Sequence, residues 1–151
     1  MPTHVEITAY YAADPDMLFA SALSFSEMTE AMAGLATYDG LPESGTAQQG
    51  DVIIVDVTFW GLFKQKGHRM MIERLDRAER VIQSRESGPS ARQWDHHLSI
   101  QPDGDQARWT DHIVIDAGWR TPIVARFALY MYRRRHRHRK ALRITQRILT
   151  H

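Results

Sequence analysis

Residues 93–115 read QWDHHLSIQPDGDQARWTDHIVI, with an alternating run on either side of Asp103-Gly104. Asp-Gly between such runs is typical of a two-residue hairpin loop, so the sequence predicts two antiparallel strands joined by Asp103 and Gly104. In this register one face is apolar except for His96, which faces Asp111, and the other face is polar throughout. The apolar pairs on the inner face are Trp94 with Ile113, Leu98 with Trp109, and Ile100 with Ala107. A His and an Asp on that face indicate a cavity with a polar spot.

Length and composition favour one folded domain over residues 1–151. A chain of 151 residues with 43% hydrophobic residues can bury one substantial core. The absence of cysteine excludes disulfides and thiolate chemistry and fits a reducing cytoplasm. Residues 1–6 show no basic segment followed by an apolar one, and no apolar run reaches the roughly 18 residues that would span a bilayer. We therefore expect a cytoplasmic protein without a signal peptide or a transmembrane segment.

Helix-start signals divide the rest of the chain. Asp14-Pro15 opens a short helix, with Asp14 as N-cap and Pro15 at the first helical position. Ser24 with Glu27 resembles a capping box and opens a second helix. Thr121-Pro122 starts the last helix, with Thr121 as N-cap, and no Gly or Pro follows it. The expected strands are residues 3–11, 51–60, 63–75 and 79–87, the expected helices after the first short one are residues 25–35 and about 123–151, and residues 39–50 form a polar loop.

This order of elements resembles the START-like (SRPBCC) superfamily, and within it the polyketide cyclase/dehydrase-like proteins. The resemblance rests on the Asp14-Pro15 entry, on the hairpin segment Ala107-Arg108-Trp109-Thr110-Asp111 and on the closing helix with its Thr121-Pro122 start. It implies an α+β helix-grip fold, in which a curved antiparallel sheet wraps around the long helix and leaves a hydrophobic cavity. It also implies binding of lipids, polyketides or other apolar molecules. The superfamily shares no catalytic motif, so the resemblance assigns no catalytic residue.

The facing pair His96 and Asp111 is the main candidate for chemistry. An Asp that faces a His can fix its tautomer and raise its basicity, which suits general acid/base catalysis. The same pair could anchor a hydroxyl or carbonyl of an apolar ligand, or it could be a structural pair inside the sheet. Beside it, Met and aromatic side chains suit a pocket wall. The predicted ligand-binding residues are Trp60, Met70, Trp94, His96, Trp109, Asp111, Phe127 and Met131, with Phe59, Met71 and Tyr130 as further candidates.

Metal and nucleotide chemistry are not expected. The neighbours His96 and His97 point to opposite faces of a strand, and His136 and His138 diverge on a helix. Neither a Gly-rich phosphate loop nor a G-x-S-x-G elbow occurs. We therefore predict no metal and no cofactor. His68 is placed either on the surface or at the cavity rim.

Charge is divided unevenly along the chain. Residues 117–151 contain ten of the 19 Lys and Arg residues and none of the 18 acidic ones, so this segment carries +10 and the preceding part −9. The run Arg133–Lys140 covers more than two helical turns, so we expect this part to emerge from the sheet or to lie at its edge. It could bind polyanions through Arg133, Arg134, Arg137 and Lys140, or the basic helix could balance the acidic body. An apolar stripe ties the helix to the domain, with Arg135 and His138 filling its gaps: Val124, Phe127, Ala128, Met131, Leu142, Thr145 and Leu149.

The sequence thus favours a protein that binds a hydrophobic small molecule in an internal cavity. One alternative is a cyclase or dehydratase that uses His96 and Asp111. The other is a polyanion-binding or assembly module that uses residues 133–140. Nucleic acid is not expected as a partner, whereas weak contact with an anionic surface and a homodimer remain open.

Overall fold

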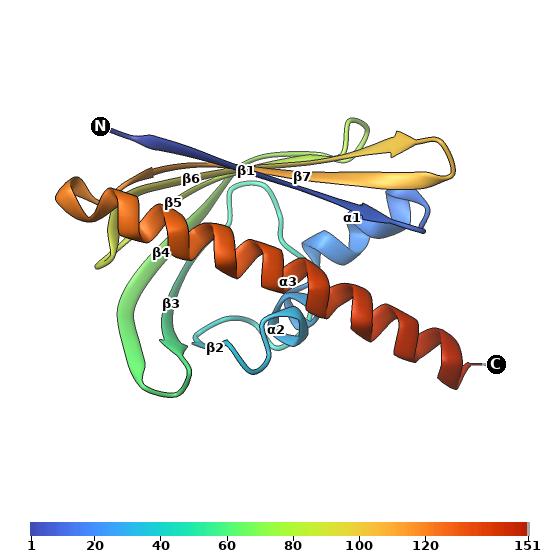
Figure 1. The fold of residues 1–151 in the computed structure, drawn as a ribbon, viewed down its shortest axis with the longest axis horizontal. Helices are drawn as coiled ribbons and strands as arrows, with labels where there is room; N and C mark the ends of the chain where they lie inside the picture. The colour runs from blue at the N-terminus through green and yellow to red at the C-terminus, as the bar shows by residue number, and fades with distance from the viewer. Residues whose placement is uncertain (151) are drawn as a thin grey trace.

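The computed structural model describes residues 1–150 and contains one seven-stranded antiparallel sheet and three α-helices (Figure 1). The strands are β1 (Thr3–Tyr11), β2 (Ala36–Asp39), β3 (Val52–Phe59), β4 (Phe63–Asp76), β5 (Val81–Gly88), β6 (Ala91–Asp103) and β7 (Gln106–Asp116). The helices are α1 (Pro15–Leu23), α2 (Phe25–Ala31), the short 3-10 helix η1 (Gly118–Arg120) and α3 (Thr121–Leu149). The predicted α+β class, with a curved sheet around a long C-terminal helix, is confirmed.

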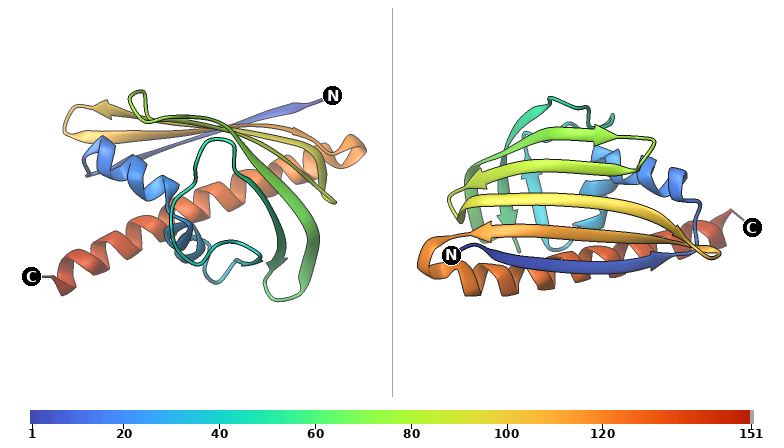
Figure 2. Two further views of the ribbon diagram at one scale, coloured as in Figure 1. Left: turned by 180° about the vertical axis from the view of Figure 1, so that it is seen from behind. Right: turned by 90° about the horizontal axis from the view of Figure 1, so that it is seen from above.

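The sheet order is β1-β7-β6-β5-β4-β3-β2, so strands β2 to β7 follow one another and β1 pairs with the last of them. Figure 2 shows how this sheet curves around α3, with β1 and β7 lying along the helix and β3 and β4 bending away from it. α1 and α2 connect β1 to β2 across the open side, where α1 contacts β6 and β7 and α2 contacts α3. A space bounded by sheet, α3 and the two short helices results.

The core lies between the concave face of the sheet and α3. In β1 every second residue from Val5 to Tyr11 is buried, as expected for a strand with one face on the core. α3 contributes Ala125 and Ala128 to this contact. Because these side chains are small, the helix axis can approach β1 closely. Met131 and Tyr132 follow one turn later and are also buried.

The hairpin loop consists of Gly104 and Asp105, not Asp103 and Gly104, so the predicted register was wrong by two residues. His96 pairs with Ile113 across the ladder, and Asp111 pairs with Leu98. Gly104 has a positive φ of 61°, whereas the φ of Asp105 is not positive. A positive φ at the first loop position alone is typical of a type II′ turn, which requires Gly there. Because the shift is even, every side chain keeps its predicted face.

Other boundaries differ by a few residues. α2 ends at Ala31, because the chain turns through Gly34 at a φ of 84°, and the unpredicted strand β2 follows. Arg120, not Thr121, is the N-cap of α3. The Thr121 hydroxyl instead donates to the carbonyl of Gly118 at 2.6 Å and closes the preceding turn.

The predicted apolar stripe of α3 was wrong in its last part. Thr145 and Leu149 are exposed because α3 runs beyond the sheet there, as Figure 1 shows.

Candidate functional site

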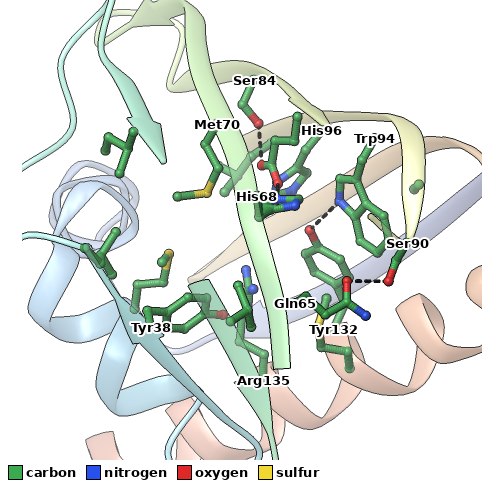
Figure 3. Close-up of a pocket in the computed structure, with 18 of the residues that line it drawn as sticks. Tyr38, Gln65, His68, Met70, Ser84, Ser90, Trp94, His96, Tyr132 and Arg135 are labelled. Atoms are coloured by element: carbon green, nitrogen blue, oxygen red, sulfur yellow. Dashed lines mark hydrogen bonds and ion pairs between the residues drawn. The ribbon is translucent and has the colours of Figure 1, made fainter. Parts of the chain in front are cut away.

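A cavity of about 480 Å³ lies between the concave sheet, α3 and the α1–α2 region. Most of its wall is apolar, as Figure 3 shows for Met70 and Trp94. Eleven polar residues interrupt this wall. They are Ser24, Tyr38, Gln65, His68, Ser84, Glu86, Ser90, His96, Tyr132, Arg135 and Arg139. Such a combination of apolar area and few polar groups is typical of small-molecule sites.

Most of the residues predicted for ligand binding do line this cavity. They are Trp60, Met70, Trp94, His96, Trp109, Phe127 and Met131, together with the further candidate Phe59. Asp111 does not line it, because its side chain is buried behind His96. Met71 and Tyr130 are absent from the wall as well. Met71 is the neighbour of Met70 and points to the other face of β4. That the predicted residues bind a ligand stays a prediction.

One rim of the cavity carries exposed apolar side chains. Trp60 is 49% exposed, Phe63 61% and Ile123 67%, and all three also line the cavity. Phe127 packs edge-on against Phe59, with ring centroids 5.1 Å apart, and against Trp60 at 6.0 Å. The tip of the β3–β4 hairpin and the first turns of α3 therefore form the mouth.

Behind the wall a hydrogen-bonded chain joins β1, β7, β6 and α3. Asp111 is 1% exposed and accepts from Nε2 of His96 and Nε2 of His136, each at 2.7 Å. The indole N–H of Trp109 also donates to it at 3.1 Å. On the far side of His136, Nδ1 lies 2.6 Å from the Tyr11 hydroxyl. Asp111 and His96 are thus in contact as predicted, although diagonally across the strands.

The protonation states in this chain follow from burial and from these contacts. Burial opposes ionisation of Asp111, but hydrogen bonds from His136 and His96 outweigh it and hold the pKa of the carboxyl far below its ordinary range. Burial lowers the pKa of His136 despite the nearby carboxylate, so this imidazole is neutral. Burial raises the pKa of Tyr11. A neutral His136 donates through Nε2 and accepts the Tyr11 hydroxyl hydrogen at Nδ1.

The geometry leaves His96 with one free nitrogen. Its Nε2 donates to Asp111, and Nδ1 has no hydrogen-bond partner among residues 1–150. Because His96 also lines the cavity, this nitrogen can accept a hydrogen bond or a proton from a bound molecule. Asp111 then acts through His96, since it fixes the tautomer.

A second polar group lies on β4 and β5, and the sequence singled out His68 in it but not its partners. Nε2 of His68 is 2.9 Å from Oε2 of Glu86, and the Ser84 hydroxyl donates to Oε1 at 2.9 Å. Burial acts to raise the pKa of Glu86, but the hydrogen bond and charge of His68 lower it below its ordinary value. Gly88 leaves room for His68, since a Cβ there would lie 2.9 Å from Nδ1. His68 lines the cavity. Its partner Glu86 lies on the neighbouring strand, so the sequence around His68 gives no signal for it.

Of the two positions predicted for the basic run, emergence from the sheet is wrong, whereas α3 does contact the edge strand β1. His136 and Arg139 are buried, and Arg135 lines the cavity. The expectation failed because remote strands supply partners: Asp111 and Tyr11 bind His136, and the Trp109 ring lies 4.6 Å from the guanidinium carbon of Arg139.

Within the same run, Arg133 and Arg137 are exposed, and Arg134 donates to the carbonyl of Ala33. No Arg or Lys of α3 forms an ion pair with a carboxylate of residues 1–150. Direct ion pairs therefore do not join the basic helix to the acidic body.

Two features are absent from the described part of the chain. Residues 1–150 contain no group of three or more His, Asp or Glu side chains arranged to hold a metal ion. None of the helices in this range is both long and apolar enough to cross a membrane.

No protein-family model matches the chain, and no curated protein matches it. Solved structures do resemble it. Protein CV1439 from Chromobacterium violaceum has a TM-score of 0.71 at 12% identity, over 92% of this chain and 95% of its own. Ara h 8.0201 has a TM-score of 0.66 at 12% identity, over 93% and 99%. TTHA0849 from Thermus thermophilus has a TM-score of 0.62 at 10% identity, over 98% of both chains.

The chain has a START-like fold. Ara h 8.0201 is a Bet v 1-like representative of that fold, and the match covers almost all of both chains. At identities of 10–12% the likeness concerns the fold alone, and the polyketide cyclase-like subtype is left to the proposals below.

Proposed function

We propose that this START-like protein binds a hydrophobic small molecule in its internal cavity. The observation that carries the proposal is the volume of about 480 Å³ bounded mainly by apolar side chains. Cavities of this size that exclude bulk water favour apolar ligands, because transfer of apolar surface out of water drives binding. The exposed aromatic mouth gives such a ligand an entry path of matching polarity.

A cavity-filling variant tests the proposal. Val57 is buried and lines the cavity, whereas Val114 lies on the outer face of β7. Val57→Phe should weaken binding of the neutral fluorescent dye Nile red at least about tenfold, and Val114→Phe should leave it unchanged. Thermal melting of both variants confirms that they are folded. Equal binding by Val57→Phe and the parent chain would show that the dye binds elsewhere.

Acid/base catalysis on the bound molecule is the second candidate function. The observation that favours it is His96, which lines the cavity and has no partner for Nδ1 among residues 1–150, while Nε2 is held by Asp111 at 2.7 Å. A neutral imidazole in this arrangement can remove a proton next to a carbonyl, as a cyclase or dehydratase of the polyketide cyclase-like type requires.

Mass spectrometry of molecules that copurify with the protein tests this candidate. If the protein is a dehydratase, the parent chain should carry the dehydrated product. The variant in which His96 is replaced by Gln should carry the unreacted precursor. His96→Gln protein should then carry a molecule heavier by one water than the molecule on the parent chain. Identical molecules on both proteins would argue for binding without reaction.

A further inference from the structure

Two cations of α3 are directed into the protein and have no anionic partner there. Arg139 is 7% exposed, and its Nε and Nη1 atoms are buried without a hydrogen-bond partner among residues 1–150. Arg135 lies one helical turn earlier, and Figure 3 shows it pointing from α3 into the cavity beside Tyr38. Its Nε donates to the sulfur of Met32, at 3.2 Å. Neither guanidinium is within ion-pair distance of a carboxylate in residues 1–150.

Contacts with aromatic rings compensate these charges only in part. The guanidinium carbon of Arg135 lies 4.7 Å from the centroid of the Tyr132 ring, and that of Arg139 lies 4.6 Å from Trp109. Cation–π contacts are weaker than the cost of removing a cation from water. Burial lowers the pKa of Arg139 below its ordinary value. Burial also acts to lower the pKa of Arg135, but the nearby Tyr132, Tyr38, Asp111 and Glu86 raise it above its ordinary value. Buried charges in proteins are normally paired, so this pair of cations calls for an explanation.

The carboxylates near the two guanidinium groups do not supply the missing charge. Asp111 already accepts three hydrogen bonds, from His96, His136 and Trp109. Glu86 is engaged by His68 and Ser84. Glu27 accepts from the Ser21 hydroxyl and forms no ion pair with Arg139. Each of these acids is held in place by its own partners.

We infer that Arg135 and Arg139 bind the carboxylate head group of an amphiphilic ligand whose apolar part fills the cavity. The inference rests on the proposed function, and it specifies the chemical class of the ligand. A guanidinium presents its N–H donors in a plane, and a planar carboxylate accepts them as a pair of parallel hydrogen bonds. The guanidinium carbon of each arginine lies over one aromatic ring, Tyr132 or Trp109, and both arginines line the cavity.

The position of the pair also gives the orientation of the ligand. Ile123 lies at the exposed mouth, and Arg135 follows 12 residues later on α3, which corresponds to about 18 Å along the helix axis. The α3 wall between these two positions is formed by the apolar Val124, Phe127 and Met131 and, next to Arg135, by Tyr132. The head group therefore lies at the inner end, and the apolar tail extends toward the mouth. This arrangement fits an elongated carboxylic acid better than a compact one.

The test compares a fluorescent long-chain acid, cis-parinaric acid, with its methyl ester at neutral pH, where the acid is ionised. The parent chain should bind the acid about tenfold or more tightly than the ester, because only the acid forms charge-assisted hydrogen bonds. Arg135→Gln and Arg139→Gln should each reduce this preference to below about threefold. Arg133→Gln is the matched control, since Arg133 is exposed on the same helix, and it should keep the preference. Equal binding of acid and ester by the parent chain would overturn the inference.

Nile red separates this inference from the proposed function. Binding of the neutral dye without any preference for the acid would refute the carboxylate site and leave the apolar cavity in place. Absence of binding of dye, acid and ester would refute both.

The Tm of Arg139→Met distinguishes ligand binding from a structural role, because a structural role predicts a lower Tm. It should keep or raise the Tm, because an uncompensated buried charge is removed, and it should lose the preference for the acid. A lowered Tm with the preference intact would show that Arg139 is structural. If neither Arg139 variant folds, Arg135→Gln decides the inference by its effect on the preference.

Discussion

Replacing Asp111 with asparagine should destabilise the fold far more than its small change in shape suggests. The Asp111 carboxylate is 1% exposed and joins β7 to β6 and α3 through His96, His136 and Trp109. In the substituted side chain the remaining oxygen can still accept from His96 and Trp109. The new amide nitrogen faces Nε2 of His136, which is also a donor. Two donors at 2.7 Å cannot bond, so His136 has to move its proton to Nδ1.

The cost can be estimated from the bonds that change. With the proton on Nδ1, His136 donates to the Tyr11 oxygen, and the Tyr11 hydroxyl hydrogen loses its acceptor. Three charge-assisted hydrogen bonds become neutral ones, at about 1 kcal/mol each, and one buried hydroxyl hydrogen is left unpaired, at about 1–2 kcal/mol. Asp111→Asn should therefore lower the free energy of unfolding by about 4–5 kcal/mol, a large share of the total for a domain of this size.

Urea unfolding at neutral pH, followed by circular dichroism, measures this difference. Asp103→Asn is the matched control, because Asp103 lies at the exposed end of the same hairpin and pairs with Arg108 only at 3.4 Å. That substitution should cost less than about 0.5 kcal/mol. A loss below about 1 kcal/mol for Asp111→Asn, or one equal to that of the control, would mean that the hydrogen-bonded chain does not stabilise the fold.

Gly104→Ala should cost about 1–2 kcal/mol in urea unfolding because φ is 61° there, whereas Asp105→Ala should be near neutral, and the reverse order would contradict the loop position. Stability should fall as the pH drops below about 6.5, by up to about 1.4 kcal/mol per pH unit. The reason is that burial lowers the pKa of His136, so in this range the unfolded state binds a proton at His136 and the folded state does not. His136→Gln should remove this part of the slope in pH-dependent unfolding, and an unchanged slope would assign it to another group. RNA and anionic vesicles should bind weakly at low salt, and Arg133→Gln with Arg137→Gln should abolish this binding while Nile red still binds. Tight, sequence-selective RNA binding at physiological salt would instead make the basic helix the main functional surface.

The order of elements could be predicted because each element carries its own periodic signal. The alternation in residues 3–11 and 93–115 marks strands, and Thr121-Pro122 followed by an uninterrupted segment marks the long helix. The hairpin shows how such a prediction can be right about faces and wrong about register. Asp-Gly and Gly-Asp are both favourable two-residue loops. The first forms a type I′ turn and the second a type II′ turn. Both registers place His96 and Asp111 on one face, so the contact between these two residues survived the error.

The inner face of α3 could not be predicted in the same way. The hydrophobicity pattern predicted that residues 133–140 emerge from the sheet or lie at its edge, because a run of Arg and His residues is usually exposed to solvent. In the structure α3 packs Ala125, Ala128, Tyr132, His136 and Arg139 against the sheet or inside the domain. The three- and four-residue spacing of this set is helical. His136 and Arg139 belong to it only because Asp111, Tyr11 and Trp109 meet them from β7 and β1. Partners that distant in sequence give no local signal.

The polar interior consists of two parts that need different explanations. The hydrogen bonds of the Asp111 carboxylate and of His136 are complete within the protein, because each of these groups has its partners there and the proton positions are mutually consistent. Their expected role is stability, so substitution of these groups lowers the Tm. The guanidinium group of Arg139 is incomplete within the protein, since its buried Nε and Nη1 lack acceptors, and the Nε of Arg135 donates to the sulfur of Met32 rather than to an oxygen. Burial disfavours the charged form of Arg139, so Arg139→Met should preserve or raise the Tm and reduce binding. The opposite signs expected for Asp111→Asn and Arg139→Met distinguish a group that holds the fold together from one that a bound anion completes.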